Sequence, residues 1–254
     1  MEQSKFMQVA LEVAKKAEKV IMNYYSDSIR AELKSDQSPV TIADTEAERI
    51  IKEIISKAFP EHGFVGEEFG KEKENAEYKW IIDPIDGTKN YVRKIPLFAT
   101  EIALMKGDEL ILGVSNAPAM KELLYAEKGK GAYFNGKRIN VSKNNSLNKS
   151  YLSFGGLNLF EKHGMTRQLV GIVNKFVGRR GFGDFWSYHL LAKGSIDCMV
   201  EPDTKIWDIA AVKVIVEEAG GRVTDIKGGP VTLNTTSIIA TNGLIHDKVA
   251  EYFK

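Results

Sequence analysis

WIIDPIDGTKN, residues 80–90, sets a hydrophobic run directly before two aspartates. The hydrophobic run is typical of a strand. Pro84 cannot donate to a central ladder, so we expect the strand to end at Asp83 and the chain to turn there. Asp86 then points the same way as Asp83, and adjacent carboxylates repel each other unless a cation lies between them. The stretch therefore favours a site for a hard divalent ion such as Mg²⁺, with the carbonyl oxygen of Ile85 as a further donor.

Ordinary turn chemistry is the alternative explanation of this stretch. Asp-Gly pairs are common in turns, and Asp commonly caps helices. Other acidic residues carry the same two explanations. Glu67 and Glu68, in GFVGEEFG, are either ligands or part of a solvated loop. Asp44 and Asp208 stand where helices are expected to begin, and they are either ligands or N-caps.

The composition excludes several classes of protein. The chain has 254 residues, with 35 Lys and Arg against 34 Asp and Glu, and this balance gives no sign of a nucleic-acid or membrane-surface partner. The single cysteine, Cys198, excludes an intrachain disulfide and a zinc site built from thiolates, which indicates a reducing compartment. The N-terminus lacks the apolar block of a signal peptide, and no stretch reaches the roughly 18 apolar residues of a membrane span. We therefore expect a cytoplasmic protein.

Hydrophobic periodicity organises the first half of the chain, residues 1–145. Apolar residues at helical spacing predict helices at 4–25 and 45–58, the second with a capping box formed by Thr45 and Glu48. Short apolar segments separated by turn signals predict an antiparallel meander from 99 to 141.

Helices and strands alternate in the second half, residues 146–254. The expected elements are strands at 151–155, 197–201, 222–225 and 236–241 and helices at 159–177, 185–193, 208–219 and from 244. Together the two halves predict an α+β fold, a layered sandwich with two sheets that forms one compact unit.

Acidic motifs in a fixed order carry a resemblance to a known family. They are GEE at 66–68, DPIDGT at 83–88 and WD at 207–208, the last followed by EEAGG at 217–221. Together they resemble the inositol monophosphatase family of metal-dependent phosphatases, and the resemblance covers nearly the whole chain. It implies the layered αβαβα fold shared with fructose-1,6-bisphosphatase. It also implies a Mg²⁺-dependent phosphomonoesterase that acts on a small phosphate ester and assembles as a homodimer.

The resemblance implies which residues bind the metal. Two or three Mg²⁺ ions, for which Mn²⁺ would substitute, are held by Glu67, Asp83, the Ile85 carbonyl, Asp86 and Asp208. Asp83 bridges two ions, and Asp86 and Asp208 complete the second. Glu67 serves a third, weaker ion.

The remaining parts of the reaction are also implied by the resemblance. Gly87 and Thr88 resemble a phosphate cradle, because backbone N–H groups at a helix start bind anions. Asp44 and Thr88 resemble the pair that holds and deprotonates the attacking water, which Glu67 supports through its metal. The loop at 34–39 (KSDQSP) resembles the mobile loop that closes over the third metal, although a plain surface connection explains it equally well.

The segment 181–208 resembles the histidinol-phosphatase branch of the family, with Gly183-Asp184 followed by Tyr188 as its most telling feature. Asp184 and Glu201 are expected to face the non-phosphate end of the substrate, where carboxylates suit the ammonium group of histidinol phosphate. Glu201 suits inositol hydroxyls equally well, and Asp184 has an alternative explanation as a helix N-cap.

The expected substrate is therefore histidinol phosphate first and inositol 1-phosphate second, with 3′-phosphoadenosine 5′-phosphate and sugar bisphosphates behind them. Lys89-Asn90-Tyr91 departs from the branch, which often has Ser-Phe after the lysine, and this concerns specificity and not the reaction. A non-catalytic scaffold on the same fold is the competing class of function. Such a scaffold is expected to lack a ligand carboxylate, and this chain has them all.

Overall fold

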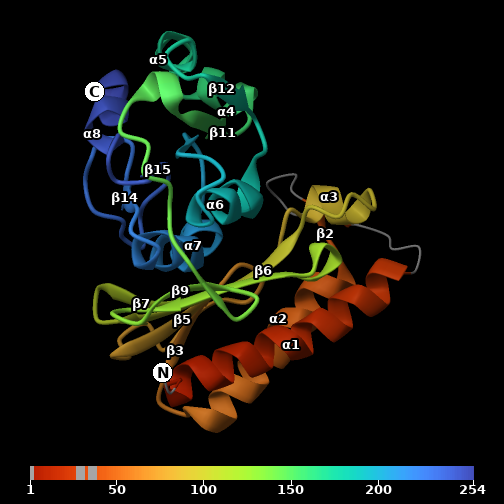
Figure 1. The fold of residues 1–254 in the computed structure, drawn as a ribbon. Coiled ribbons are helices and arrows are strands. Elements are labelled where there is room, and N and C mark those ends of the chain that lie inside the picture. The colour runs from red at the N-terminus through yellow and green to blue at the C-terminus, as the bar shows by residue number, and fades with distance from the viewer. Residues whose placement is uncertain (1–2, 27–31, 34–38) are drawn as a thin grey trace.

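The first two helices of the chain pack against each other and form one outer layer of the molecule (Figure 1). The computed structural model describes residues 3–26, 32–33 and 39–254. α1 (Lys5–Ser26) and α2 (Ile42–Ala58) contact each other and one face of the first sheet. Their connection includes a pair of short antiparallel strands, β1 (Glu32–Leu33) and β2 (Pro39–Val40). Most of the loop predicted to close over a metal, residues 34–38, lies outside the described residues.

The first sheet has eight strands in the order β10-β9-β8-β7-β6-β5-β3-β4. β6 to β10 follow one another as an antiparallel meander, which confirms the prediction for 99–141. β3 runs parallel to β5 and antiparallel to β4, a part of the sheet that the sequence did not predict. The strands are β3 (Gly63–Gly66), β4 (Gly70–Glu72), β5 (Tyr78–Asp86), β6 (Ala99–Lys106), β7 (Glu109–Ala117), β8 (Glu122–Glu127), β9 (Gly131–Phe134) and β10 (Lys137–Ile139).

The second sheet has five strands in the order β12-β11-β13-β15-β14. β11 lies parallel to both β12 and β13, and β15 lies antiparallel to both β13 and β14. β12 was not predicted. The strands are β11 (Tyr151–Phe154), β12 (Gly178–Arg180), β13 (Cys198–Glu201), β14 (Arg222–Thr224) and β15 (Ile238–Thr241).

The first of the remaining helices packs in the core beneath α1 and α2, and the others fill the space between the sheets or cover the far side of the second sheet (Figure 1). The remaining helices are α3 (Thr88–Val92), α4 (Leu157–Lys162), α5 (Thr166–Val173), α6 (Asp184–Ala192), α7 (Ile206–Glu218) and α8 (His246–Ala250), with short 3₁₀ turns at η1 (Pro118–Met120), η2 (Leu147–Lys149) and η3 (Glu251–Phe253). α6 and α7 lie between the sheets, and α4, α5 and α8 form the outer layer. The order of layers is αβαβα, which confirms the α+β sandwich.

α7 lies very close to the first sheet. A Cβ atom added to Gly113 of β7 would come 2.2 Å from the Ala211 carbonyl oxygen, so the helix backbone rests directly on the strand at that point. Ile81 and Ala103 belong to the core on this side, whereas Ile82 and Ile102 belong to the core beneath α1 and α2. Because side chains alternate along a strand, every second residue of β5 and β6 points toward α7.

Several predicted boundaries are wrong. The helix predicted at 45–58 begins earlier, at Ile42, and its capping box is formed by Thr41 and Asp44 instead of Thr45 and Glu48. The helix predicted at 159–177 is two helices, α4 and α5, because Gly164 takes a positive φ of 68° between them. Within residues 3–26, 32–33 and 39–254, none of the helices combines the length and the apolar character needed to cross a membrane.

Candidate active site

A bulge in β5 brings the two aspartates of the opening motif to the same face of the sheet. The prediction that the strand ends at Asp83 is wrong, because β5 continues through Pro84 to Asp86. Asp83 pairs with Glu101 of β6, and the next paired residue, Asp86, lies opposite Ala99, so the register shifts between the aspartates. Bulges of this kind change the direction of side chains. Asp83 follows Ile81 at strand spacing, which directs it toward α7, and the backbone N–H of Phe185 in α6 donates to Asp86 Oδ2 at 2.9 Å.

These two aspartates lie in a group of carboxylates that repel one another. Asp83 is only 2% exposed, and its Oδ1 has no hydrogen-bond partner among the described residues. Burial raises the pKa of Asp83 well above its usual value, and repulsion from Glu67, Asp86 and Asp208 adds to the shift. Burial also raises the pKa of Asp86, with repulsion from Asp184 and Asp208. Such a group of oxygens suits a divalent cation of the hard kind.

Asp208 joins this group from a different layer of the fold. It lies in the first turn of α7, where its Oδ2 accepts hydrogen bonds from the backbone N–H of Lys205 at 2.7 Å and from Thr204 Oγ1 at 3.0 Å. These bonds fix the carboxylate at the helix start, but Lys205 and not Asp208 is the N-cap residue. Burial raises the pKa of Asp208 to about 6 despite these bonds.

Glu67 follows β3 and is anchored beside β5, because its backbone N–H donates to the Ile82 carbonyl at 3.1 Å. The turn after it is held by Glu48 of α2, which accepts from the backbone N–H groups of Glu68 at 2.8 Å and Phe69 at 3.2 Å. Gly66 is required for this arrangement, since a Cβ atom there would lie 1.9 Å from Glu48 Oε1. Glu48 thus holds the acidic turn, a role that its assignment to a capping box missed.

Asp44 and Thr88 lie together beside the bulge. Asp44 Oδ2 accepts from the backbone N–H of Thr41 at 2.8 Å and from its hydroxyl at 2.6 Å. Thr88 Oγ1 lies 3.4 Å from Asp44 Oδ1 and 3.0 Å from the Ile85 carbonyl oxygen. Burial raises the pKa of Asp44 to about 7. Gly87, the residue before α3, has a φ of 87°, and a Cβ atom there would meet the Leu97 carbonyl oxygen at 2.6 Å.

The residues predicted to select the substrate belong to α6 and β13. Asp184 is the first residue of α6 and has a φ of 45°, a strained conformation of the kind found at functional sites. Burial raises its pKa, and the nearby Lys89 ammonium opposes this shift. Tyr188 donates to Glu201 Oε2 at 2.8 Å, and burial, followed by repulsion from Asp184, raises the pKa of Glu201 to about 8.

The predicted ligands share one neighbourhood but do not form a closed cage. Across the described ranges, no three His, Cys, Asp or Glu side chains are already close enough to hold an ion together. Carboxylates repel one another, and this explains why the predicted ligands lie apart. The chemistry of the donors and the buried, unpartnered oxygen of Asp83 fit a hard cation.

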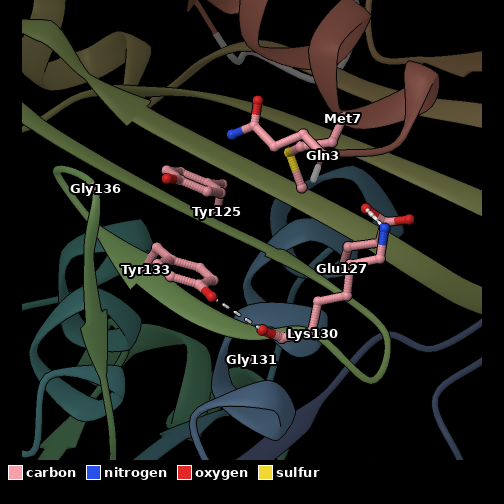
Figure 2. A pocket seen from close by; sticks show the side chains of 8 residues that line it. All are labelled: Gln3, Met7, Tyr125, Glu127, Lys130, Gly131, Tyr133 and Gly136. Carbon is pink, nitrogen blue, oxygen red and sulfur yellow. Dashed lines mark hydrogen bonds and ion pairs between the residues drawn. The ribbon is translucent and has the colours of Figure 1, made fainter. Parts of the chain in front are cut away.

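A pocket of about 230 Å³ lies on the opposite face of the first sheet, beside α1 (Figure 2). Its wall includes the stacked rings of Tyr125 and Tyr133, whose centroids are 5.3 Å apart. Tyr125 pairs with Val114, which in turn pairs with Ile102 of the core beneath α1 and α2. Paired residues share a face, so this pocket is separated from the carboxylates by the sheet. The other lining residues are Gln3, Met7, Glu127, Lys130, Gly131 and Gly136.

The chain is similar to known phosphatases over nearly its whole length. The model of the inositol monophosphatase family matches residues 2–254. The histidinol-phosphatase of Mycobacterium tuberculosis is 36% identical over 251 residues, covering 96% of this chain and 95% of that protein. The inositol-1-monophosphatase of Mesorhizobium japonicum is 34% identical over 251 residues, covering 96% and 94%. The crystal structure of the extragenic suppressor protein suhB from Bartonella henselae superposes with a TM-score of 0.92 at 34% identity, covering 99% of each chain.

The free energy of unfolding without divalent cations is expected to fall as pH rises from about 5 to 8. The pKa is raised by burial to about 6 for Asp208, about 7 for Asp44 and Glu48, and about 8 for Glu201. A carboxyl with a higher pKa in the folded protein stabilises the fold while it is protonated, and this stability is lost as pH rises through that pKa. Urea unfolding in EDTA at several pH values measures the effect.

Histidines set the range in which this result is decisive. Burial lowers the pKa of His189 and His246, and these groups add stability with rising pH, but only up to about pH 6.5, where an unfolded histidine becomes neutral. A free energy of unfolding that stays constant or rises between pH 6.5 and 8 would contradict the expectation.

Proposed function

This chain belongs to the inositol monophosphatase family and is a phosphoric monoester hydrolase, and we propose that it uses Mg²⁺ to hydrolyse histidinol phosphate. The observation that carries the metal requirement is the buried, unpartnered Oδ1 of Asp83 among the carboxylates of Glu67, Asp86 and Asp208. Carboxylates at such a density favour a divalent cation. From the resemblance to the family, we also propose that two or three Mg²⁺ ions bind and that Mn²⁺ can replace them. The same resemblance suggests a homodimer.

The proposed ligands come from three parts of the fold. Asp83, the Ile85 carbonyl and Asp86 belong to the bulge, Glu67 follows β3, and Asp208 opens α7. The ions, when bound, lower the pKa of a water molecule and neutralise charge on the phosphate oxygens. The protein fixes the ligands in position, which is most of the catalysis that phosphoryl transfer needs.

Asp44 and Thr88 hold and deprotonate the attacking water in this proposal. The Thr88 hydroxyl lies within reach of Asp44 Oδ1, and a carboxylate with a pKa of about 7 is suited to accept a proton at neutral pH. The water oxygen forms a bond to phosphorus, and the proton of this water passes through Thr88 to Asp44. The bond from phosphorus to the ester oxygen breaks, and the leaving ester oxygen takes a proton from solvent water to give the free alcohol. The backbone N–H groups of Gly87 and Thr88 bind the phosphate oxygens.

Substrate choice depends on Asp184 and Glu201. Glu201 is buried and Asp184 is half-buried near it, and the Lys89 ammonium acts on Asp184. An ammonium group placed here would gain charge-assisted hydrogen bonds. Histidinol phosphate has such a group and inositol phosphate does not, and this favours histidinol phosphate. Inositol 1-phosphate remains the second candidate, because a relative of 34% identity is named for that activity.

Asp83→Asn is expected to lower kcat for release of inorganic phosphate by at least about 10³-fold, or roughly 4 kcal/mol of barrier. The substitution removes a charge that the proposal assigns to both ions, while it keeps the size of the side chain. Activity at saturating Mg²⁺ measures the effect, with EDTA as the metal-free reference. Asp108→Asn, in the exposed turn between β6 and β7, is the matched control and should keep full activity. Near-normal kcat in Asp83→Asn would remove the ligand assignment.

Glu201→Gln is expected to lower kcat/KM for histidinol phosphate by about tenfold or more, because a hydrogen bond to a charged group contributes about 1.5–3 kcal/mol. The substitution should lower kcat/KM for inositol 1-phosphate less, because this ester has no ammonium group that could bind the Glu201 carboxylate. The measurement compares both esters on the purified wild-type and variant proteins, with Glu217→Gln on the exposed side of α7 as control. Equal or faster turnover of inositol 1-phosphate by the wild type would reverse the order of substrates.

A further inference from the structure

Glu101 is a buried carboxylate that the reaction proposed above does not use. It lies in the middle of β6 and is only 1% exposed. Its Oε1 accepts a hydrogen bond from Ser115 Oγ at 2.5 Å. Its Oε2 is buried and has no hydrogen-bond partner among the described residues. A buried charge without a partner is costly, so this oxygen needs an explanation.

The sheet directs Glu101 toward the aspartates of the bulge. Glu101 lies directly opposite Asp83, and Ala99, two residues earlier on the same face, lies opposite Asp86. Directly opposed residues in antiparallel strands have Cβ atoms about 4.5–5.5 Å apart and point to the same face. Glu101 therefore projects from the face that carries Asp83, and this face is covered by α6 and α7.

A chain of hydrogen bonds holds the other oxygen of Glu101. Ser115 Oγ lies 2.6 Å from His189 Nε2, and His189 Nδ1 lies 2.9 Å from Glu122 Oε2. Lys193 Nζ donates to Glu122 Oε1 at 2.7 Å, which balances the charge at the far end. The chain thus fixes Oε1 on the side of Ser115.

The hydrogen bonds from Glu101 through Ser115 and His189 to Glu122 can all form with a shared proton in either of two positions. In both, Nδ1–H of His189 donates to Glu122. In the first, protonated Glu101 donates to Ser115, whose hydroxyl donates to Nε2 of neutral His189. In the second, the proton of Glu101 has moved to Ser115, the hydroxyl proton of Ser115 has moved to Nε2, and Glu101 is a carboxylate. In both, Oε2 takes no part in these hydrogen bonds.

We propose that Glu101 is a further carboxylate ligand of the cation site, binding through Oε2 the ion that Asp86 and Asp208 share. Ser115 and His189 are positioning residues that hold Oε1. This inference rests on the metal dependence proposed above. Glu101 and Asp86 project from the same face of neighbouring strands, and Asp208 is close enough to repel both of them.

The test measures Mn²⁺ binding to the purified protein without substrate. Isothermal titration calorimetry gives the affinity, and electron paramagnetic resonance gives the concentration of free Mn²⁺. Glu101→Gln should weaken at least one Mn²⁺ site by tenfold or more and reduce the Mn²⁺-induced rise in Tm. Glu218→Gln is the matched control, because it removes a charge from the far end of α7, where Glu218 accepts from the backbone N–H groups of Gly129 and Gly131. The control should bind Mn²⁺ as the wild type does.

A second variant covers the case in which Glu101→Gln does not fold. Glu101→Asp keeps the charge but withdraws the carboxylate by one methylene, and it should also weaken Mn²⁺ binding. Unchanged Mn²⁺ affinity in every folded Glu101 variant would overturn the inference and leave the proposed function intact, with Glu101 a protonated group that only bonds to Ser115. Failure of the wild type itself to bind Mn²⁺ would overturn both.

Discussion

Repulsion among buried carboxylates is the constraint on which the rest of this structure depends. Burial raises the pKa values of Asp83, Asp86 and Asp208, and repulsion from neighbouring carboxylates adds to each shift. Hydrophobic packing must therefore hold together groups that separate when charged. The sheets and helices supply that packing. In the proposed function, a bound divalent cation would remove the repulsion and so stabilise the folded protein.

The αβαβα order is what allows carboxylates from distant parts of the chain to meet. β5 and β6 lie side by side, so the bulge at Asp83 faces Glu101 directly. α7 rests on the same face of the sheet at Gly113, and its first turn brings Asp208 to the bulge. α6 begins at Asp184 and contributes the backbone N–H that binds Asp86. The middle helical layer therefore both closes the core and completes the site.

The sequence was sufficient for the family, the fold class and the antiparallel meander, because the motif at 80–90 is specific and the hydrophobic periods are regular. It was insufficient where the pairing of strands distant in the sequence decides the structure and local sequence preferences do not. Pro84 was expected to end a strand, but a bulge accommodates it. The role of Glu101 depends on its pairing with Asp83 and Ser115, which no spacing reveals. A usable signal was present, since a charged residue interrupts the apolar run of ATEIALM at 99–105.

The most direct measurement of the central claim is anomalous diffraction from crystals of this protein soaked in Mn²⁺. The account predicts at least one strong anomalous peak within about 2–2.5 Å of carboxylate oxygens of both Asp83 and Asp86, the distance range of oxygen ligands to such cations. Strong peaks found only elsewhere on the molecule, or an empty bulge in a crystal that retains its diffraction, would contradict it.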